Sequence, residues 1–187
     1  MSYQCTLSNG DVATIKRRDS SRAKRLRLTL AGGEITLTVP AGTTERAVEA
    51  FLQEKSDWIQ DKWRQLLRTR EQYPDIATDT KAHYDEHKDL ACQQARQKVD
   101  YWNVDLQLSF NEVRVRRMKT RWGSCTGKKN LHFNYKILFL PDELQDYLVV
   151  HELCHLMHPN HSADFWTAVE DILPDYQIHH RTLRELT

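Results

Sequence analysis

Five consecutive residues near the end of the chain, His151-Glu152-Leu153-Cys154-His155, constrain its fold more than any other segment. They lie within residues 141–158, where the spacing of apolar side chains predicts a helix. Residues four apart share one face of a helix, so the two imidazoles can reach a single metal ion. Glu152 follows the first histidine directly, and its carboxylate can accept a proton from a metal-activated water. The motif therefore predicts a catalytic metal site with Glu152 as general base.

A catalytic zinc site takes a third protein ligand, and His161 is the candidate. Pro159 disfavours the helical conformation at His158, so the helix should end there and the chain can turn back toward the metal. The predicted ligand set for one Zn²⁺ ion is therefore His151, His155 and His161.

A second polar segment, from Lys119 to Ser124, lies between two predicted strands. Lys119 and Arg121 can hold a substrate carboxylate or phosphate, and the planar guanidinium can do so with two hydrogen bonds. Gly123 allows backbone to approach a ligand closely, and Ser124 completes this predicted substrate-binding set. The alternative is a structural turn in which Arg121 pairs with the acidic end of the chain. We expect Trp122 to lie in the core in either case.

Charge is segregated along the chain, although the net charge is only +1. Residues 101–141 carry eight basic and two acidic residues, whereas residues 142–187 carry two basic and nine acidic ones. No acidic residue occurs from 113 to 141. This asymmetry suits an anionic substrate near the basic segment. Alternatively, the oppositely charged blocks attract one another within the fold.

The remaining histidines are interpreted as structural or solvent-facing. His83 and His87 also lie four apart on a predicted helix, but their charged neighbours indicate a solvated face and not a second metal site. His179 and His180 are expected on the surface. Metal-binding imidazoles usually need acceptors that orient them. The candidate acceptors are the acidic residues that follow the third ligand, Asp164, Glu170 and Asp171.

The composition of the 187 residues, 40% of them hydrophobic, is that of a folded protein. No apolar run approaches the roughly 20 residues that a membrane span needs, and the first residues lack a signal pattern. We therefore expect a cytoplasmic protein with no membrane partner. The four cysteines fit neither a zinc knuckle nor a disulfide framework. We expect them to be reduced, with Cys92 and Cys154 as small core residues.

The hydrophobic pattern predicts an α+β fold. Alternating leucines and valines around Gly32-Gly33 indicate a β-hairpin over residues 25–39, and Thr43 or Thr44 can cap a helix that runs to about residue 70. A second helix is expected over residues 79–101, with Tyr84, Leu90 and Ala91 on its buried face.

The second half of the chain should begin with strands and end with helices. Apolar residues alternate from Leu106 through Phe110 to Val115, and again over residues 131–139. Three helices are expected at about 141–158, 162–173 and 175–186. We expect residues 1–75 to form an N-terminal hairpin and helix region, and residues 76–187 to form the catalytic domain.

Three blocks of this sequence carry a resemblance to the YgjP-like family of zincin-type metal-dependent hydrolases. These blocks are Lys119-Thr120-Arg121-Trp122-Gly123-Ser124-Cys125, the histidine motif at 151–155, and Asn160-His161-Ser162 with Phe165-Trp166. The family is similar to SprT-type metalloprotease domains. The resemblance implies a zincin-like fold with zinc at His151, His155 and His161, and a catalytic Glu152. The hairpin and helix before these blocks resemble the family's leader segment.

Three functions remain open at this stage. The first is a metallopeptidase. The second is a nucleoside triphosphate pyrophosphohydrolase, because the resemblance extends to a UTP pyrophosphatase, although the chain has no Gly-rich phosphate loop and no clustered carboxylates for magnesium. The third is a non-enzymatic zinc protein or nucleic-acid-binding module that uses the basic blocks. The expected partner is accordingly a peptide or a nucleotide, with nucleic acid as a weaker alternative.

Overall fold

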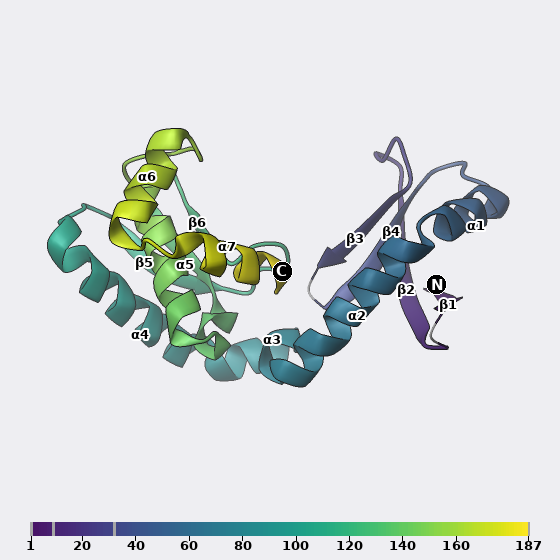
Figure 1. The fold of residues 1–187 in the computed structure, drawn as a ribbon, viewed down its shortest axis with the longest axis horizontal. Coiled ribbons are helices and arrows are strands. Elements are labelled where there is room, and N and C mark those ends of the chain that lie inside the picture. Colours follow the sequence, from purple (N-terminus) through teal and green to yellow (C-terminus); the bar gives the residue numbers. More distant parts are fainter. Residues whose placement is uncertain (1, 9, 32, 187) are drawn as a thin grey trace. The chain divides into compact units, whose positions relative to one another are not determined.

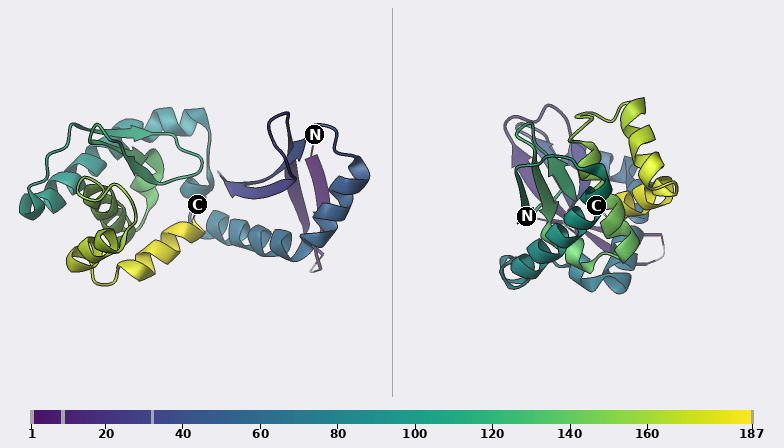
Figure 2. Two further views of the ribbon diagram at one scale, coloured as in Figure 1. Left: turned by 90° about the horizontal axis from the view of Figure 1, so that it is seen from above. Right: turned by 90° about the vertical axis from the view of Figure 1, so that its left-hand side faces the viewer.

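The computed structural model describes residues 2–8, 10–31 and 33–186 and has a mixed α+β fold. The chain forms two compact units, residues 1–77 and residues 78–187, which we call the N-terminal unit and the C-terminal unit. Figure 1 shows the elements of each unit, and Figure 2 shows them from two further sides. Among the described residues, no helix is long and apolar enough to cross a membrane.

The N-terminal unit is built on a sheet of four strands in the order β1-β2-β4-β3. The strands are β1 (Ser2–Thr6), β2 (Val12–Ser20), β3 (Arg27–Ala31) and β4 (Glu34–Pro40). The antiparallel β3–β4 pair confirms the predicted hairpin. β4 also pairs in parallel with β2, which places it in the middle of the sheet. The core of this unit consists of the apolar residues Leu7, Ala13, Ile15, Ile35, Leu37, Val39, Val48, Leu52 and Ile59.

Two consecutive helices, α1 (Glu45–Glu54) and α2 (Ser56–Gln72), take the place of the single helix that the pattern predicted. The Thr44 side chain accepts the N–H of Ala47, so the predicted cap is confirmed. The division falls at Lys55, just before Ser56 and Asp57, residues that favour the start of a helix over its interior. A short helix, α3 (Pro74–Ala77), follows.

The C-terminal unit begins with the long helix α4 (Lys81–Leu106), which extends five residues beyond its predicted end. A strand through Leu106 and Phe110 was therefore a wrong prediction. The helix stops at Gln107, which has a left-handed backbone with φ of 49°, and the Asn103 side chain binds both backbone groups of Leu108. Alternation over so few residues cannot distinguish a strand from a helix end followed by a turn. Leu90, predicted on the buried face, is 55% exposed.

A three-stranded sheet of order β5-β7-β6 follows, with β5 (Glu112–Arg116), β6 (Gly123–Cys125) and β7 (Asn130–Asn134). The predicted strand over residues 131–139 ends early, because a 3-10 helix, η1 (Tyr135–Phe139), replaces its second half. The Asn134 side chain accepts the N–H of Lys136 and starts this helix. Three successive residues are all buried, namely Tyr135, Lys136 and Ile137. The alternation of apolar residues in this segment therefore does not correspond to a strand with one exposed face.

Helices α5 (Asp142–Cys154), α6 (Ala163–Ile172) and α7 (Tyr176–Glu185) complete the unit. α5 lies against α4 on one side and against α6 and α7 on the other (Figures 1 and 2). It is buried along most of its length, and it ends at Cys154 rather than at the predicted His158. Cys154 is buried as predicted, whereas Cys92 is only half-buried.

Candidate metal centre

Three histidine rings converge at the end of α5. His151 lies in the last turn of the helix, and His155 occupies the position that follows its last residue. His161 lies in the loop before α6, where Ser162 caps the helix by accepting the N–H of Phe165. Each ring offers one nitrogen, and these nitrogens all lie within 4.8 Å of one another. The structure thus brings together the three residues predicted as metal ligands.

The other ring nitrogens of two of these histidines are engaged by neighbouring groups. His155 Nδ1 lies 3.0 Å from the carbonyl oxygen of His158, and His151 Nδ1 lies 3.3 Å from the Tyr147 hydroxyl. Such contacts fix ring orientation and leave Nε2 for a metal. The predicted acceptors were wrong, because no described hydrogen bond joins Asp164, Glu170 or Asp171 to these rings. Tyr147 was missed, although it precedes His151 by four residues on the same helical face.

Aromatic rings support the histidines from α6. Phe165, which is fully buried, stacks on His155 with ring centroids 4.4 Å apart. Trp166 stacks on His161 at 5.5 Å and on His180 at 5.0 Å. Two rings of α6 therefore form a wall against which the side chains of the candidate ligands rest.

Burial favours the neutral form that metals require in two of the candidate ligands, His151 and His155. Burial, with the rings of His155, His161 and His180, lowers the pKa of His151 to about 3. Burial also lowers the pKa of His155, against the opposing effect of its bond to the His158 carbonyl. A neutral imidazole has a free lone pair, so at neutral pH both rings can bind a cation without first losing a proton.

Glu152 lies beside these rings and is almost completely buried, with 3% of its surface exposed. One carboxylate oxygen accepts the backbone N–H of Cys125 in β6. The other, Oε2, has no hydrogen-bond partner among the described residues. Burial raises the pKa of Glu152 to about 8, although the nearby Arg121 and the Cys125 amide favour the ionised form. A buried oxygen without a partner is costly, and the approach of a metal-bound water or a cation would relieve that cost.

Gly123 makes room for this carboxylate. A β-carbon built at Gly123 would lie 2.8 Å from Cδ and 2.9 Å from Cγ of Glu152, and closer still to Oε1. Any larger residue would therefore push Glu152 away from β6. The sequence pointed to Gly123 as a place where backbone approaches a ligand closely; the structure shows that what approaches is the side chain of Glu152.

A cleft of about 240 Å³ opens over Glu152, His151 and His161. Of the predicted substrate-binding residues, Arg121 and Gly123 line it, whereas Lys119 and Ser124 are not among its lining residues. Two residues of α7, His180 and Arg184, also line it. His180, which was expected on the surface, is half-buried and lines this cleft. No local pattern links α7 to a motif about thirty residues earlier, so the sequence gave no signal for these two residues.

Arg121 and Arg184 supply the charge of the cleft. Both side chains are exposed, and neither takes part in an ion pair among the residues that the structure describes. The alternative of Arg121 paired to the acidic end of the chain is thus not observed. Trp122, the residue after Arg121, is buried as predicted, and its indole N–H donates to the carbonyl of Leu183 at 3.1 Å.

The second histidine pair lies elsewhere in the unit. His83 Nδ1 is 3.1 Å from the hydroxyl of Tyr135, and His87 Nδ1 is 2.9 Å from the carbonyl of His83. Both rings contact Phe139. Among the described residues they belong to no cluster of three metal-binding side chains. Both residues pack against neighbouring side chains, whereas their charged sequence neighbours had indicated a fully solvated face.

A helix with two histidines and a buried glutamate, a third histidine after it, and a small sheet beside it define the metallopeptidase-like class of domain. The family model described as YgjP-like, metallopeptidase domain matches residues 24–95 and 72–186, and the chain belongs to this family. The predicted resemblance is confirmed. Membership implies a hydrolase that uses a metal, typically zinc, and the three converging histidines fit such an ion.

Solved structures that match part of this chain include two metallopeptidase zymogens. Abylysin from Pyrococcus abyssi is 23% identical over 47% of this chain and 90% of its own, with a TM-score of 0.43. Jannalysin from Methanocaldococcus jannaschii is 24% identical over 50% of this chain and 97% of its own, with the same TM-score. None of the curated proteins matches this chain.

Proposed function

We propose that the chain is a zinc-dependent peptidase in which His151, His155 and His161 hold the ion and Glu152 is the general base. One observation carries this proposal: the three ring nitrogens lie within 4.8 Å of one another, and the cleft that His151 and His161 line is also lined by Glu152, whose buried Oε2 has no partner among the described residues. A structural zinc site has four protein ligands and no base. Three ligands with an adjacent carboxylate favour catalysis.

When bound, the ion polarises the substrate carbonyl and lowers the pKa of a water to about 7. Glu152 would accept one proton of the attacking water at Oε2 as the water oxygen bonds to the carbonyl carbon. The carboxyl group returns the proton to the leaving nitrogen as the C–N bond breaks, so Glu152 ends the cycle ionised. The Cys125 amide holds the other oxygen and keeps the carboxylate in place throughout.

β6 offers a binding edge for an extended peptide. It is one of the two edge strands of its sheet, and Gly123 lines the same cleft as Glu152. Trp122 accepts from Asn134, and Thr126 donates to Asn130, so these two residues face β7. Because hydrogen-bonding direction alternates along a strand, the backbone of Gly123 faces the open edge. A substrate strand can pair there with its scissile bond close to the base.

The two arginines of the cleft favour a substrate with an anionic group near the scissile bond. Arg121 and Arg184 line the cleft from two different elements and are free of described ion pairs. Either guanidinium can bind a carboxylate with two hydrogen bonds. We therefore expect preference for acidic side chains, or for a C-terminal carboxylate, beside the cleaved bond.

The test is digestion of casein and a mixed peptide library by the zinc-loaded chain, with the cleaved bonds identified by mass spectrometry. Cleavage that zinc supports and a chelator abolishes, enriched next to acidic residues, is the expected result. If Arg121→Gln and Arg184→Gln leave the acidic preference unchanged, the arginines do not select the substrate. If no metal supports cleavage of any peptide, the peptidase assignment is wrong.

A second candidate is hydrolysis of a nucleoside triphosphate such as UTP, and the same arginines favour it because they also suit phosphate. The distinguishing measurement is release of pyrophosphate from UTP by the zinc-loaded chain. If the parent chain releases pyrophosphate but cleaves no peptide, and Glu152→Gln releases none, the chain is a nucleoside triphosphate hydrolase and not a peptidase. Release that persists in Glu152→Gln would come from a contaminating enzyme.

A further inference from the structure

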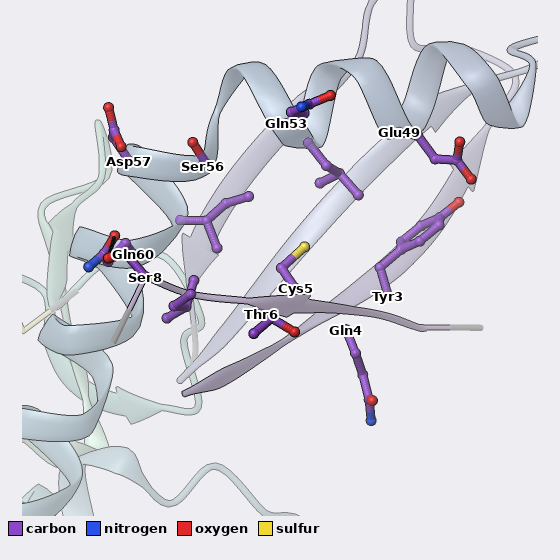
Figure 3. Close-up of a pocket in the computed structure, with 13 residues that line it drawn as sticks. Tyr3, Gln4, Cys5, Thr6, Ser8, Glu49, Gln53, Ser56, Asp57 and Gln60 are labelled. Carbon is purple, nitrogen blue, oxygen red and sulfur yellow. Dashed lines mark hydrogen bonds between the residues drawn. The ribbon is translucent and has the colours of Figure 1, made fainter. Parts of the chain in front are cut away.

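A larger cavity lies in the N-terminal unit. It measures about 520 Å³ and is lined by β1 on one side and by α1 and α2 on the other. Figure 3 shows it as a groove, with Tyr3 and Cys5 of the strand directed toward the helices. Cys5, Leu52 and Ile59 contribute apolar surface to it. We call it the β1 groove.

Side-chain contacts bound the β1 groove at both ends. At one end Ser8 donates to Gln60 at 2.9 Å. At the other, the Tyr3 hydroxyl donates to Glu45 at 2.9 Å, and Arg17 binds both of these groups. The distance between the ends is set by a five-residue strand, which spans about 17 Å at roughly 3.3 Å per residue. The groove therefore has the length of a short extended peptide.

The strand that borders the groove has an open edge. In the described sheet β1 pairs with β2 alone. The Leu7 N–H donates to Asp11, and its carbonyl accepts from Gly10, so the backbone of Leu7 faces β2. Because direction alternates along a strand, Gln4 and Thr6 direct their N–H and C=O groups outward. These outward groups are a template onto which another extended segment can add.

The charge of the β1 groove indicates what that segment carries. Its only charged lining residues in the described chain are Glu49 and Asp57, one from each helix. Both are exposed, and neither appears in a described ion pair. An extended segment with lysine or arginine would place its cations against these carboxylates. β1 of a second copy has no charged residue, so it lacks this complementarity.

We propose that the β1 groove binds an extended, basic polypeptide segment of a partner protein, which adds as a strand to β1. Backbone hydrogen bonds to Gln4 and Thr6 supply the pairing. Apolar side chains of the segment enter the groove, and its cationic side chains meet Glu49 and Asp57. This is the arrangement of strand addition, in which the backbone gives affinity and alternate side chains give specificity. It requires nothing of the metal centre.

The probe is a fluorescent eight-residue peptide of alternating valine and lysine, and its anisotropy is measured with the full-length Glu152→Gln chain, which leaves the probe uncut. The same peptide with glutamate in place of lysine is the matched probe. We expect binding of the lysine peptide at least tenfold tighter than that of the glutamate peptide. Equal binding of the two would overturn the proposal.

Two variants test where the peptide sits. Glu49→Gln with Asp57→Asn should weaken binding about fivefold to tenfold, since each exposed charge contributes modestly. Glu54→Gln with Asp61→Asn, which removes two helix charges outside the groove, should leave binding unchanged. If both pairs weaken binding equally, the attraction is general and the groove is not its site.

Gln4→Pro tests the backbone pairing. Proline removes the outward N–H of this edge strand without removing a bond to β2. We expect an unchanged melting temperature and at least fivefold weaker peptide binding. Unchanged binding in a folded variant would exclude strand addition. Sedimentation of the unliganded chain provides a separate check: a dimer that Gln4→Pro dissociates would show that a second copy, and not a basic partner, occupies the groove.

Discussion

At the scale of single residues, the proposed base is the buried carboxylate of Glu152, and Gly123 makes room for it beside β6. A β-carbon at Gly123 would overlap the Glu152 side chain, so Gly123→Ala should displace the base while the histidines stay in place. Misplacing a reacting group by about 1 Å can cost roughly 100-fold in rate. We expect kcat to fall by about 10- to 100-fold with bound zinc unchanged.

The matched control for this change is Gly127→Ala. Nothing lies within 4 Å of a β-carbon built at Gly127, so this variant should retain full activity. Steady-state kinetics and metal content of both variants check the prediction. Equal activity of Gly123→Ala and the parent chain would mean that Glu152 does not need its place beside β6.

The pKa of Glu152 also predicts a dependence of stability on pH. Burial raises this pKa from about 4.5 to about 8, so in the metal-free chain the folded state binds a proton that the unfolded state has lost. The free energy of unfolding must then fall as pH rises through that window. Glu152→Gln has no such group, and its stability relative to the parent should grow by a few kcal/mol between pH 5 and pH 8.

Urea denaturation of both proteins in the presence of a chelator, at several pH values, measures this difference. The titrations of the histidines are common to both proteins and cancel to first order. A difference that stays constant from pH 5 to pH 8 would show that Glu152 is ionised in the folded, metal-free chain.

Tyr147 is expected to orient one ligand. Its hydroxyl lies 3.3 Å from His151 Nδ1, and loss of such a partner typically weakens metal binding by about 10- to 100-fold. Tyr147→Phe should therefore raise the Kd for zinc by at least tenfold while the fold is retained. Competition with a chromophoric chelator measures this Kd. Zinc affinity equal to that of the parent would assign Tyr147 to packing alone.

At the scale of elements, the loop between α5 and α6 presents His161, the proposed third ligand. Ser162 caps α6 directly after His161, and losing such a cap costs about 1 kcal/mol. Ser162→Ala should lower stability by that amount and also weaken zinc binding severalfold. Thr44→Ala removes an equivalent cap from α1 and should leave zinc affinity unchanged. If the two variants bind zinc equally tightly, the Ser162 cap does not help to position His161.

The elements also show what the sequence could predict. His151 and His155 follow from the four-residue spacing of one helix, and the break at Pro159 predicted the return of His161. The β3–β4 hairpin followed from two alternating stretches around a glycine turn. In contrast, alternation misled at Leu106–Phe110, because three alternating apolar residues also fit a helix end followed by a turn that Asn103 holds.

Contacts between distant segments had no such local signal. His180 and Arg184 reach the cleft only because α7 packs against α5. The acceptor for His155 is a backbone carbonyl, which every residue has, so the sequence cannot identify it. Gly123 was correctly singled out, but a glycine does not tell which group approaches it. Local sequence patterns, helical spacing and the break at Pro159, thus predicted the candidate ligands, whereas the surroundings of these residues depend on tertiary packing.

At the scale of the whole molecule, each unit has its own sheet and its own helices, and the candidate ligands belong to one of them. The proposed function requires zinc to bind the folded site, and the ion should then stabilise the fold by about 2.7 kcal/mol at 100 times its Kd. Zinc should slow the hydrogen exchange of backbone amides in α5 and β6, and it should change exchange little in β2 and β4. Equal protection in both units would mean that they unfold as one body.

The central claim is that three histidines hold one metal ion and that Glu152 acts on the substrate without binding the metal. The most direct measurement determines bound zinc per chain and turnover of a cleaved peptide for the parent and for Glu152→Gln. We predict one zinc per chain in both proteins and a loss of turnover of at least 100-fold in the variant. Loss of zinc together with turnover would show that Glu152 is a ligand or a structural residue, and would contradict the account.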